Sequence, residues 1–76
     1  MTLSEMTANG QCRVVSAAVD NIETQSRLYA LGVYPGVLVD VLRFAPTGDP
    51  IQIRIGSSLL SIRKSEAKLI SVEQSA

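Results

Sequence analysis

Residues 37–63 have the sequence Val-Leu-Val-Asp-Val-Leu-Arg-Phe-Ala-Pro-Thr-Gly-Asp-Pro-Ile-Gln-Ile-Arg-Ile-Gly-Ser-Ser-Leu-Leu-Ser-Ile-Arg, and this stretch decides the fold. Isoleucine alternates with a polar residue from 51 to 55, which is typical of a strand with one buried face. Apolar runs at 37–43 and 59–63 predict a strand on either side of it. The connections at 45–50 and 56–58 are rich in turn-forming residues. The segment therefore predicts three strands that follow one another through short turns.

Two further strands are expected outside this segment, at residues 10–19 and 70–73, each bounded by turn formers. A short helical turn at residues 65–68, with Ser65 as its cap, is expected before the last strand. Five short strands at close spacing predict a mainly β protein, a small SH3-like antiparallel β-barrel with one helix inserted after the first strand. The OB-fold is the nearest alternative of this kind, but it usually needs a longer chain.

The inserted helix is expected to begin at a capping box. Asp20 is followed three residues later by Glu23, so that aspartate takes the usual serine or threonine role. Gly32 supplies the left-handed residue that commonly ends a helix. A helix of this length does not persist alone in water, so we expect it to pack on the sheet. Its expected apolar anchors are Ile22, Leu28 and Leu31.

Length and charge limit the function classes. The 76 residues form one domain, with residues 1–9 and 74–76 expected to be loosely ordered and with Leu3 and Met6 able to attach the first segment to the core. Seven basic and seven acidic residues give a net charge of zero. That balance argues against binding of nucleic acid or of an anionic membrane through a basic surplus.

The missing residue types exclude several kinds of chemistry. The chain has no histidine and one cysteine, so it offers no Ser-His or Cys-His pair and no internal disulfide. We therefore expect a protein that is not an enzyme and that works in a reducing compartment, the cytoplasm. No apolar run approaches the length of a membrane-spanning helix, and residues 1–9 lack the pattern of a signal peptide.

Three motifs carry a resemblance to a known family. Residues 27–36 follow the pattern R-L-x-x-L-G-x-x-P-G, residues 45–51 follow A-P-x-G-D-P-I, and residues 60–73 follow L-S-L-R-x-x-E-A-x-x-I-x-V-E. In this order and spacing they resemble the FeoA family over nearly the whole chain. The family usually has a glycine followed by a large residue in the hairpin at 56–58, where this chain has Gly-Ser-Ser.

The resemblance implies an SH3-like barrel that serves in ferrous iron uptake. Its implied partner is FeoB, a membrane transporter with a cytoplasmic GTP-binding domain, on which this chain would dock as an accessory protein. A related barrel is the C-terminal domain of metal-dependent repressors. The alternative is therefore a regulatory module that binds a peptide segment and a transition metal ion.

The loop at 45–50 is the first candidate for contact with the partner, because loops on stiff scaffolds often carry recognition. Its structural alternative is a rigid hairpin connection in which Gly48 has a positive φ and Asp49 bonds its own backbone. Tyr34 and Phe44 are aromatic candidates for interface anchors, or else they pack on neighbouring prolines. The expected partner-binding residues are Arg27, Tyr34, Phe44, Pro46, Thr47, Gly48, Asp49 and Pro50.

No cofactor is expected. The acidic residues never form a close D-x-D or E-x-x-E cluster, so a divalent metal ion could be bound only where tertiary structure brings them together. Cys12 lies in a predicted strand and is expected to be a small buried apolar residue. Self-association through a free strand edge is left open by the sequence.

Overall fold

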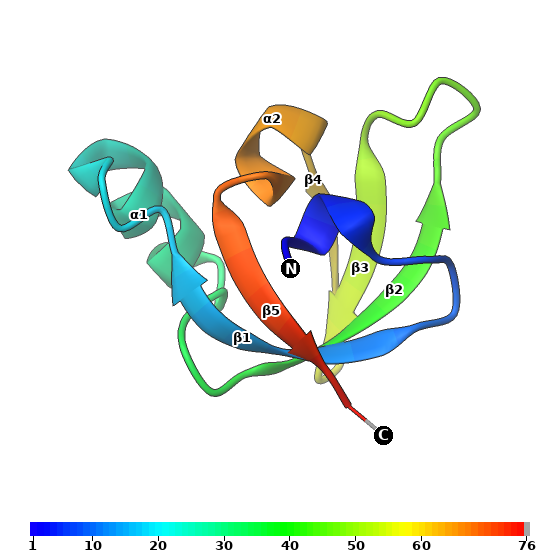
Figure 1. Ribbon diagram of the computed structural model, residues 1–76, viewed down its shortest axis with the longest axis horizontal. Helices are drawn as coiled ribbons and strands as arrows, with labels where there is room; N and C mark the ends of the chain where they lie inside the picture. The colour runs from blue at the N-terminus through cyan, green and yellow to red at the C-terminus, as the bar shows by residue number, and fades with distance from the viewer. Residues whose placement is uncertain (76) are drawn as a thin grey trace.

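The computed structural model describes residues 1–75 and places five strands in one antiparallel sheet, in the order β4-β3-β2-β1-β5. Figure 1 shows the strands curving around a common centre instead of lying flat. The predicted mainly β fold, with five strands and one short helix after the first, is confirmed. The strands are β1 Gln11–Ala17, β2 Leu38–Phe44, β3 Ile51–Ile55, β4 Ser58–Ile62 and β5 Ile70–Gln74.

The alternation of apolar residues places one face of the sheet in the core. Ile51 and Ile53 of β3 are fully buried, as the sequence pattern predicts, and Ile55 packs against them at the margin. Register shifts at residues 14–16 and 41–43 mark irregularities in β1 and β2. Such bulges bend a strand and increase its twist, which helps this short sheet to curl around its own core.

The first segment is attached to the core through Leu3 and Met6, as expected, while residues 7–9 are exposed. A 3-10 turn, η1 Leu3–Glu5, inserts Leu3 completely into the core, and Met6 is also buried. Thr2 forms a bridge with Ser71, and the N–H of Val72 donates to the carbonyl of Met1. The segment thereby covers the open edge of β5, as the blue turn beside the red strand in Figure 1 shows.

At the other end of the chain, Gln74 belongs to β5, and the N–H of Ser75 donates to the carbonyl of Gln11 at 3.0 Å. Backbone pairing thus connects both residues to β1. Ala76 lies outside the described residues.

The helix α1, Ile22–Ala30, begins one residue later than predicted. Its N-cap is Asn21, whose Oδ1 accepts from the N–H of Thr24 at 3.1 Å, so the predicted capping box at Asp20 is wrong. The strand before it also ends earlier than expected, at Ala17, because the next residue turns the chain with a φ of 46°. Asp20 and Asn21 can both cap a helix, and the bend at Ala18 places Asn21 in the capping position.

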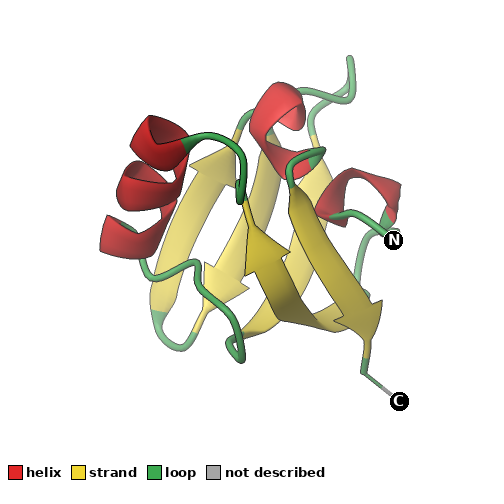
Figure 2. Cartoon of the chain, turned by 60° about the vertical axis from the view of Figure 1, so that its left-hand side comes forward, coloured by secondary structure: helices red, strands yellow, loops and turns green. Residues whose placement is uncertain are grey.

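Only one of the three predicted anchors of α1 is buried. Leu28 is completely enclosed, whereas Ile22 and Leu31 are exposed, so those two predictions are wrong. Val33, just past the helix, supplies the next core side chain, and its N–H bonds the carbonyl of Leu28 at 2.9 Å. Figure 2 shows the helical segments at the periphery of the strands, which explains why so little of α1 faces the core.

The second helix, α2 Lys64–Ala67, connects β4 to β5. The prediction that Ser65 caps it is wrong, because Ser65 lies inside the helix and Arg63 occupies the N-cap position. Within residues 1–75, no helix is both long enough and apolar enough to cross a membrane.

Candidate functional site

The loop between β2 and β3 is held by its own hydrogen bonds. The N–H of Gly48 donates to the carbonyl of Ala45 at 2.7 Å, and the N–H of Ala45 donates to the carbonyl of Pro50 at 3.1 Å. The hydroxyl of Thr47 donates to the carbonyl of Asp49 at 3.2 Å. Gly48 has a φ of 86°, as expected for a glycine in such a turn. The loop is therefore a defined turn.

The carboxylate of Asp49 was expected to accept a hydrogen bond from its own backbone, and this expectation is wrong. Its Oδ1 instead accepts from the N–H of Lys64, 15 residues away, at 3.0 Å. Lys64 is the first residue of α2, and the first N–H groups of a helix have no partner inside it. Asp49 therefore supplies the missing cap from another part of the chain and ties the loop to α2.

Arg27 ties α1 to the same helix. Its guanidinium pairs with the carboxylate of Glu66 in α2, and the side chain of Glu66 is only 15% exposed. The side chain of Arg27 remains 60% exposed. Partial burial of one partner reduces solvent screening of the pair relative to a fully exposed one. Arg27 therefore links α1 to α2 and leaves more than half of its side chain exposed.

Tyr34 packs on an aromatic neighbour. Its ring lies against Tyr29 of α1 with a centroid separation of 6.3 Å and an angle of 64° between the rings, an edge-to-face contact. Both side chains are nearly half exposed. The two rings form an exposed aromatic pair at the end of α1.

Of the other predicted partner-binding residues, one packs on the core and the others are on the surface. Phe44 packs against the hydrophobic core and is partly buried, which leaves it little surface for a partner. The exposed members of the loop are Pro46, Thr47, Asp49 and Pro50.

The structure connects the two groups of candidates through α2, which bonds Arg27 on one side and Asp49 on the other. Lys64, Glu66 and Tyr29 are not predicted from the sequence as parts of this surface. Their contacts join residues that are 5 to 39 positions apart in the sequence, and no local sequence pattern predicts such contacts.

Metal-ligating groups are dispersed. Within residues 1–75, no three cysteine or acidic side chains are grouped to hold a metal ion. Cys12 is buried, as predicted, and its pKa is raised by desolvation and by the neighbouring carboxylate of Asp40. Asp40 itself accepts from Gln11 at 2.9 Å and from Arg54 at 3.4 Å. These residues stabilise the sheet by contacts with one another.

A curled five-stranded antiparallel sheet with a peripheral helix after its first strand defines the class as SH3-like barrels. A FeoA structure from Stenotrophomonas maltophilia, described as a procaryotic SH3 domain protein complexed with zinc, is 32% identical with a TM-score of 0.82. The match covers 96% of this chain and 89% of that one.

The FeoA domain model matches residues 1–74, and the chain belongs to the FeoA family. The FeoA protein of Chlorobium tepidum is 41% identical, with a TM-score of 0.89 over all of this chain and 71% of the other. The resemblance noted in the sequence is therefore confirmed.

The fold also occurs in a metal-dependent regulator. The manganese regulator SloR superposes with a TM-score of 0.85 over 99% of this chain and 34% of its own length. Its sequence identity is 17%, so the likeness concerns the fold.

Proposed function

We propose that this chain is a non-catalytic accessory protein of ferrous iron transport, which docks on the cytoplasmic part of a FeoB-like membrane GTPase transporter. The observation that carries the proposal is the FeoA family match over residues 1–74. It is supported by the relative from Stenotrophomonas maltophilia, whose description concerns an activating factor of bacterial ferrous iron transport. In this proposal the protein is cytoplasmic and iron is the transporter's cargo.

The proposed docking surface consists of the exposed loop 46–50, Arg27 and the tyrosine pair at the end of α1. The loop is fixed by internal hydrogen bonds, and Asp49 and Arg27 both bond to α2. A surface that is already ordered loses little conformational entropy on binding. Tyrosine and arginine are also the residue types most often found as energetic anchors at protein interfaces. These features favour a surface for a protein partner.

A titration against the cytoplasmic domain of the cognate transporter tests the proposal. Calorimetry is run in the GDP-bound and GTP-analogue-bound states with the unaltered chain, Tyr34→Ser and Thr47→Arg. We expect each substitution to weaken binding by about tenfold or more, as for an interface anchor. The matched control is Val15→Thr, which alters an exposed apolar residue on β1 and leaves affinity unchanged.

Two results contradict the proposal. One is no binding in either nucleotide state, and the other is normal ferrous iron uptake in a strain that lacks this protein. The rival function, a metal-responsive regulatory module, is suggested by the fold shared with the manganese regulator SloR and by the zinc in the Stenotrophomonas maltophilia relative. Calorimetry with iron(II), manganese(II) and zinc(II) separates the two, because tight one-to-one metal binding would support the rival.

A further inference from the structure

The strand β4 leaves one edge of the sheet open. It is the last strand in the order, and among residues 1–75 its one strand partner is β3. A two-residue turn joins the two strands, with Gly56 at a φ of 60°, and Ile55 lies opposite Ser58. In such a hairpin the hydrogen-bonded pairs alternate, so the backbone groups of Leu59 and Ser61 point away from β3. Among residues 1–75, no further hydrogen bond reaches these two backbones.

The sequence of β4 lacks the usual protection of a sheet edge. The strand reads Ser-Leu-Leu-Ser-Ile, with no charge and no proline, and its register with β3 is regular throughout. Natural edge strands commonly carry charges, prolines or bulges that prevent pairing with another chain. The opposite edge, β5, is covered by the first two residues of the chain. β4 is thus the edge that remains available.

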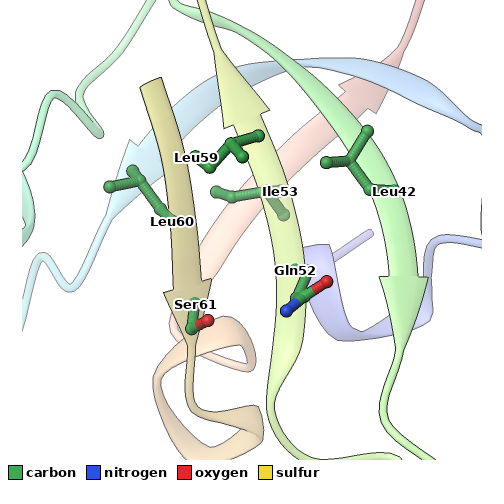
Figure 3. Close-up of a pocket in the computed structure, with 6 residues that line it drawn as sticks. All are labelled: Leu42, Gln52, Ile53, Leu59, Leu60 and Ser61. Atoms are coloured by element: carbon green, nitrogen blue, oxygen red, sulfur yellow. The ribbon is translucent and has the colours of Figure 1, made fainter. Parts of the chain in front are cut away.

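An apolar hollow of about 100 Å³ lies beside this edge. In Figure 3 the side chains of Leu42 and Leu59 point toward one another across β3, from the strands on its two sides. Leu59 is 71% exposed although it is a large apolar residue within β4. The hollow is lined by Leu42, Gln52, Ile53, Leu59, Leu60 and Ser61.

The same outer face carries positive charge. Gln52 and Arg54 alternate with the buried isoleucines of β3 and therefore point outward. Their partners on the neighbouring strands point the same way: Arg43 and Ser61 lie opposite Gln52, and Leu59 lies opposite Arg54. Arg63 follows Ser61 at the next position of the same parity. The acidic residue on strands β2, β3 and β4 is Asp40, which pairs with Arg54. Arg43 and Arg54 against Asp40 leave the strand face with an excess of one positive charge, and Arg63 follows directly after the end of β4.

We propose that the open edge of β4 binds an extended segment of a partner protein, which adds to the sheet as a sixth strand. The segment carries a large apolar side chain that enters the hollow at Leu42 and Leu59. Acidic residues two positions to either side of it lie on the same face, because strand side chains alternate. They meet the arginines around the hollow. This edge is separate from the loop and the tyrosine pair of the proposed function.

A second copy of this chain is a poorer occupant of the edge. Two β4 strands paired about a two-fold axis would join the sheets with their outer faces on the same side. Arg43 and Arg54 of each copy would then share one continuous face, where like charges oppose association. An acidic and apolar segment complements both the hollow and the charge.

The test uses the full chain and a synthetic peptide, acetyl-Thr-Glu-Val-Leu-Val-Glu-Thr-amide, with a lysine version in which both glutamates are replaced. Amide hydrogen exchange is followed by NMR, and affinity by fluorescence polarisation of the labelled peptides. We expect the amides of Leu59 and Ser61 to exchange about tenfold more slowly with the glutamate peptide bound, because they become hydrogen-bonded. We expect the lysine peptide to bind at least about tenfold more weakly.

Variants locate the site. Leu59→Ser removes the apolar wall and is expected to weaken binding by about tenfold, and Arg63→Gln is expected to weaken it by about threefold. The matched controls are Ile22→Ser, at a 73% exposed apolar residue on α1, and Lys68→Gln, and both leave the affinity unchanged.

Three outcomes overturn the proposal, and each uses the unaltered chain. The first is no binding of the glutamate peptide at about 1 mM, a concentration that detects even weak complexes. The second is equal affinity for the lysine peptide. The third is protection of the Leu59 and Ser61 amides without peptide that increases with protein concentration, which would assign the edge to a second copy. Loss of transporter docking affects none of these measurements, so failure of the proposed function is distinguishable.

Discussion

Replacing Asp49 with alanine tests the contact that holds the loop 45–50 against α2. In the folded protein its Oδ1 accepts from the N–H of Lys64 at 3.0 Å, across 15 residues of sequence. Alanine leaves that N–H without its partner while the loop retains its own hydrogen bonds. Asparagine keeps an oxygen acceptor at the same position and removes only the charge. The pair of substitutions therefore separates the hydrogen bond from the charge.

The expected magnitude follows from the role of Asp49 as a helix cap. Replacing a capping side chain by alanine costs about 0.5–2 kcal/mol, and because Asp49 is exposed we expect about 1 kcal/mol for Asp49→Ala. In a chain of 76 residues, 1 kcal/mol corresponds to a fall in melting temperature of about 4–8 °C. We expect Asp49→Asn to cost less than half of this free energy, because its amide oxygen still accepts the bond.

Thermal and urea unfolding measure the loss, and amide exchange at Lys64 locates it. Loss of a bond worth about 1 kcal/mol accelerates local exchange by about fivefold. The control is Thr47→Ala in the same loop, which removes only the bond to the carbonyl of Asp49 and leaves the tie to α2 intact. The reasoning is refuted if Asp49→Ala is no more destabilising than Thr47→Ala. It is also refuted if exchange at Lys64 is unchanged.

Three further predictions concern the N-terminal half of the chain. Asn21→Ala is expected to lower the unfolding free energy by about 1 kcal/mol, because it removes the cap of α1, while Asp20→Ala changes it by less than about 0.5 kcal/mol; equal losses in urea unfolding would contradict the assigned cap. Leu3→Ala is expected to cost about 2–5 kcal/mol in the same measurement, because Leu3 is fully buried, and a loss below about 1 kcal/mol would show that the first segment does not pack. Cys12 is expected to resist maleimide until the protein unfolds, because its side chain is completely buried, and burial and Asp40 also raise its thiol pKa. Since the thiol pKa is higher in the folded state than in the unfolded state, the unfolding free energy is expected to fall as the pH rises above about 9.0, the ordinary value of this thiol; rapid labelling of the folded protein would contradict the burial of Cys12.

Much of the fold could be predicted because its signals are local. The alternation at residues 51–55 requires one buried face, and Ile51 and Ile53 are buried as expected. The positive φ of Gly48 follows from the turn composition around it. The family motifs likewise lie in short stretches, and the family match over residues 1–74 confirms them.

The N-cap of α1 was predicted wrongly because two neighbouring residues could both have capped the helix. Asp20 and Asn21 have equivalent side chains for this purpose, and the bend at Ala18 decides which of them meets the first turn of α1. Ile22 and Leu31 were expected in the core because helices usually bury an apolar stripe. This helix lies at the rim of the sheet, so Leu28 alone reaches the interior.

The sequence by itself determined the five strands, the turns between them, the family and the absence of histidine chemistry, because periodicity, turn residues and composition act within a few positions. The tertiary structure alone decided that Asp49 caps α2, that Arg27 pairs with Glu66 and that Leu3 closes the core. It also decided that β5 is covered while β4 is open. The physical reason is that these contacts join residues far apart in the chain, whose partners are selected by the curvature of the sheet and not by their neighbours in sequence.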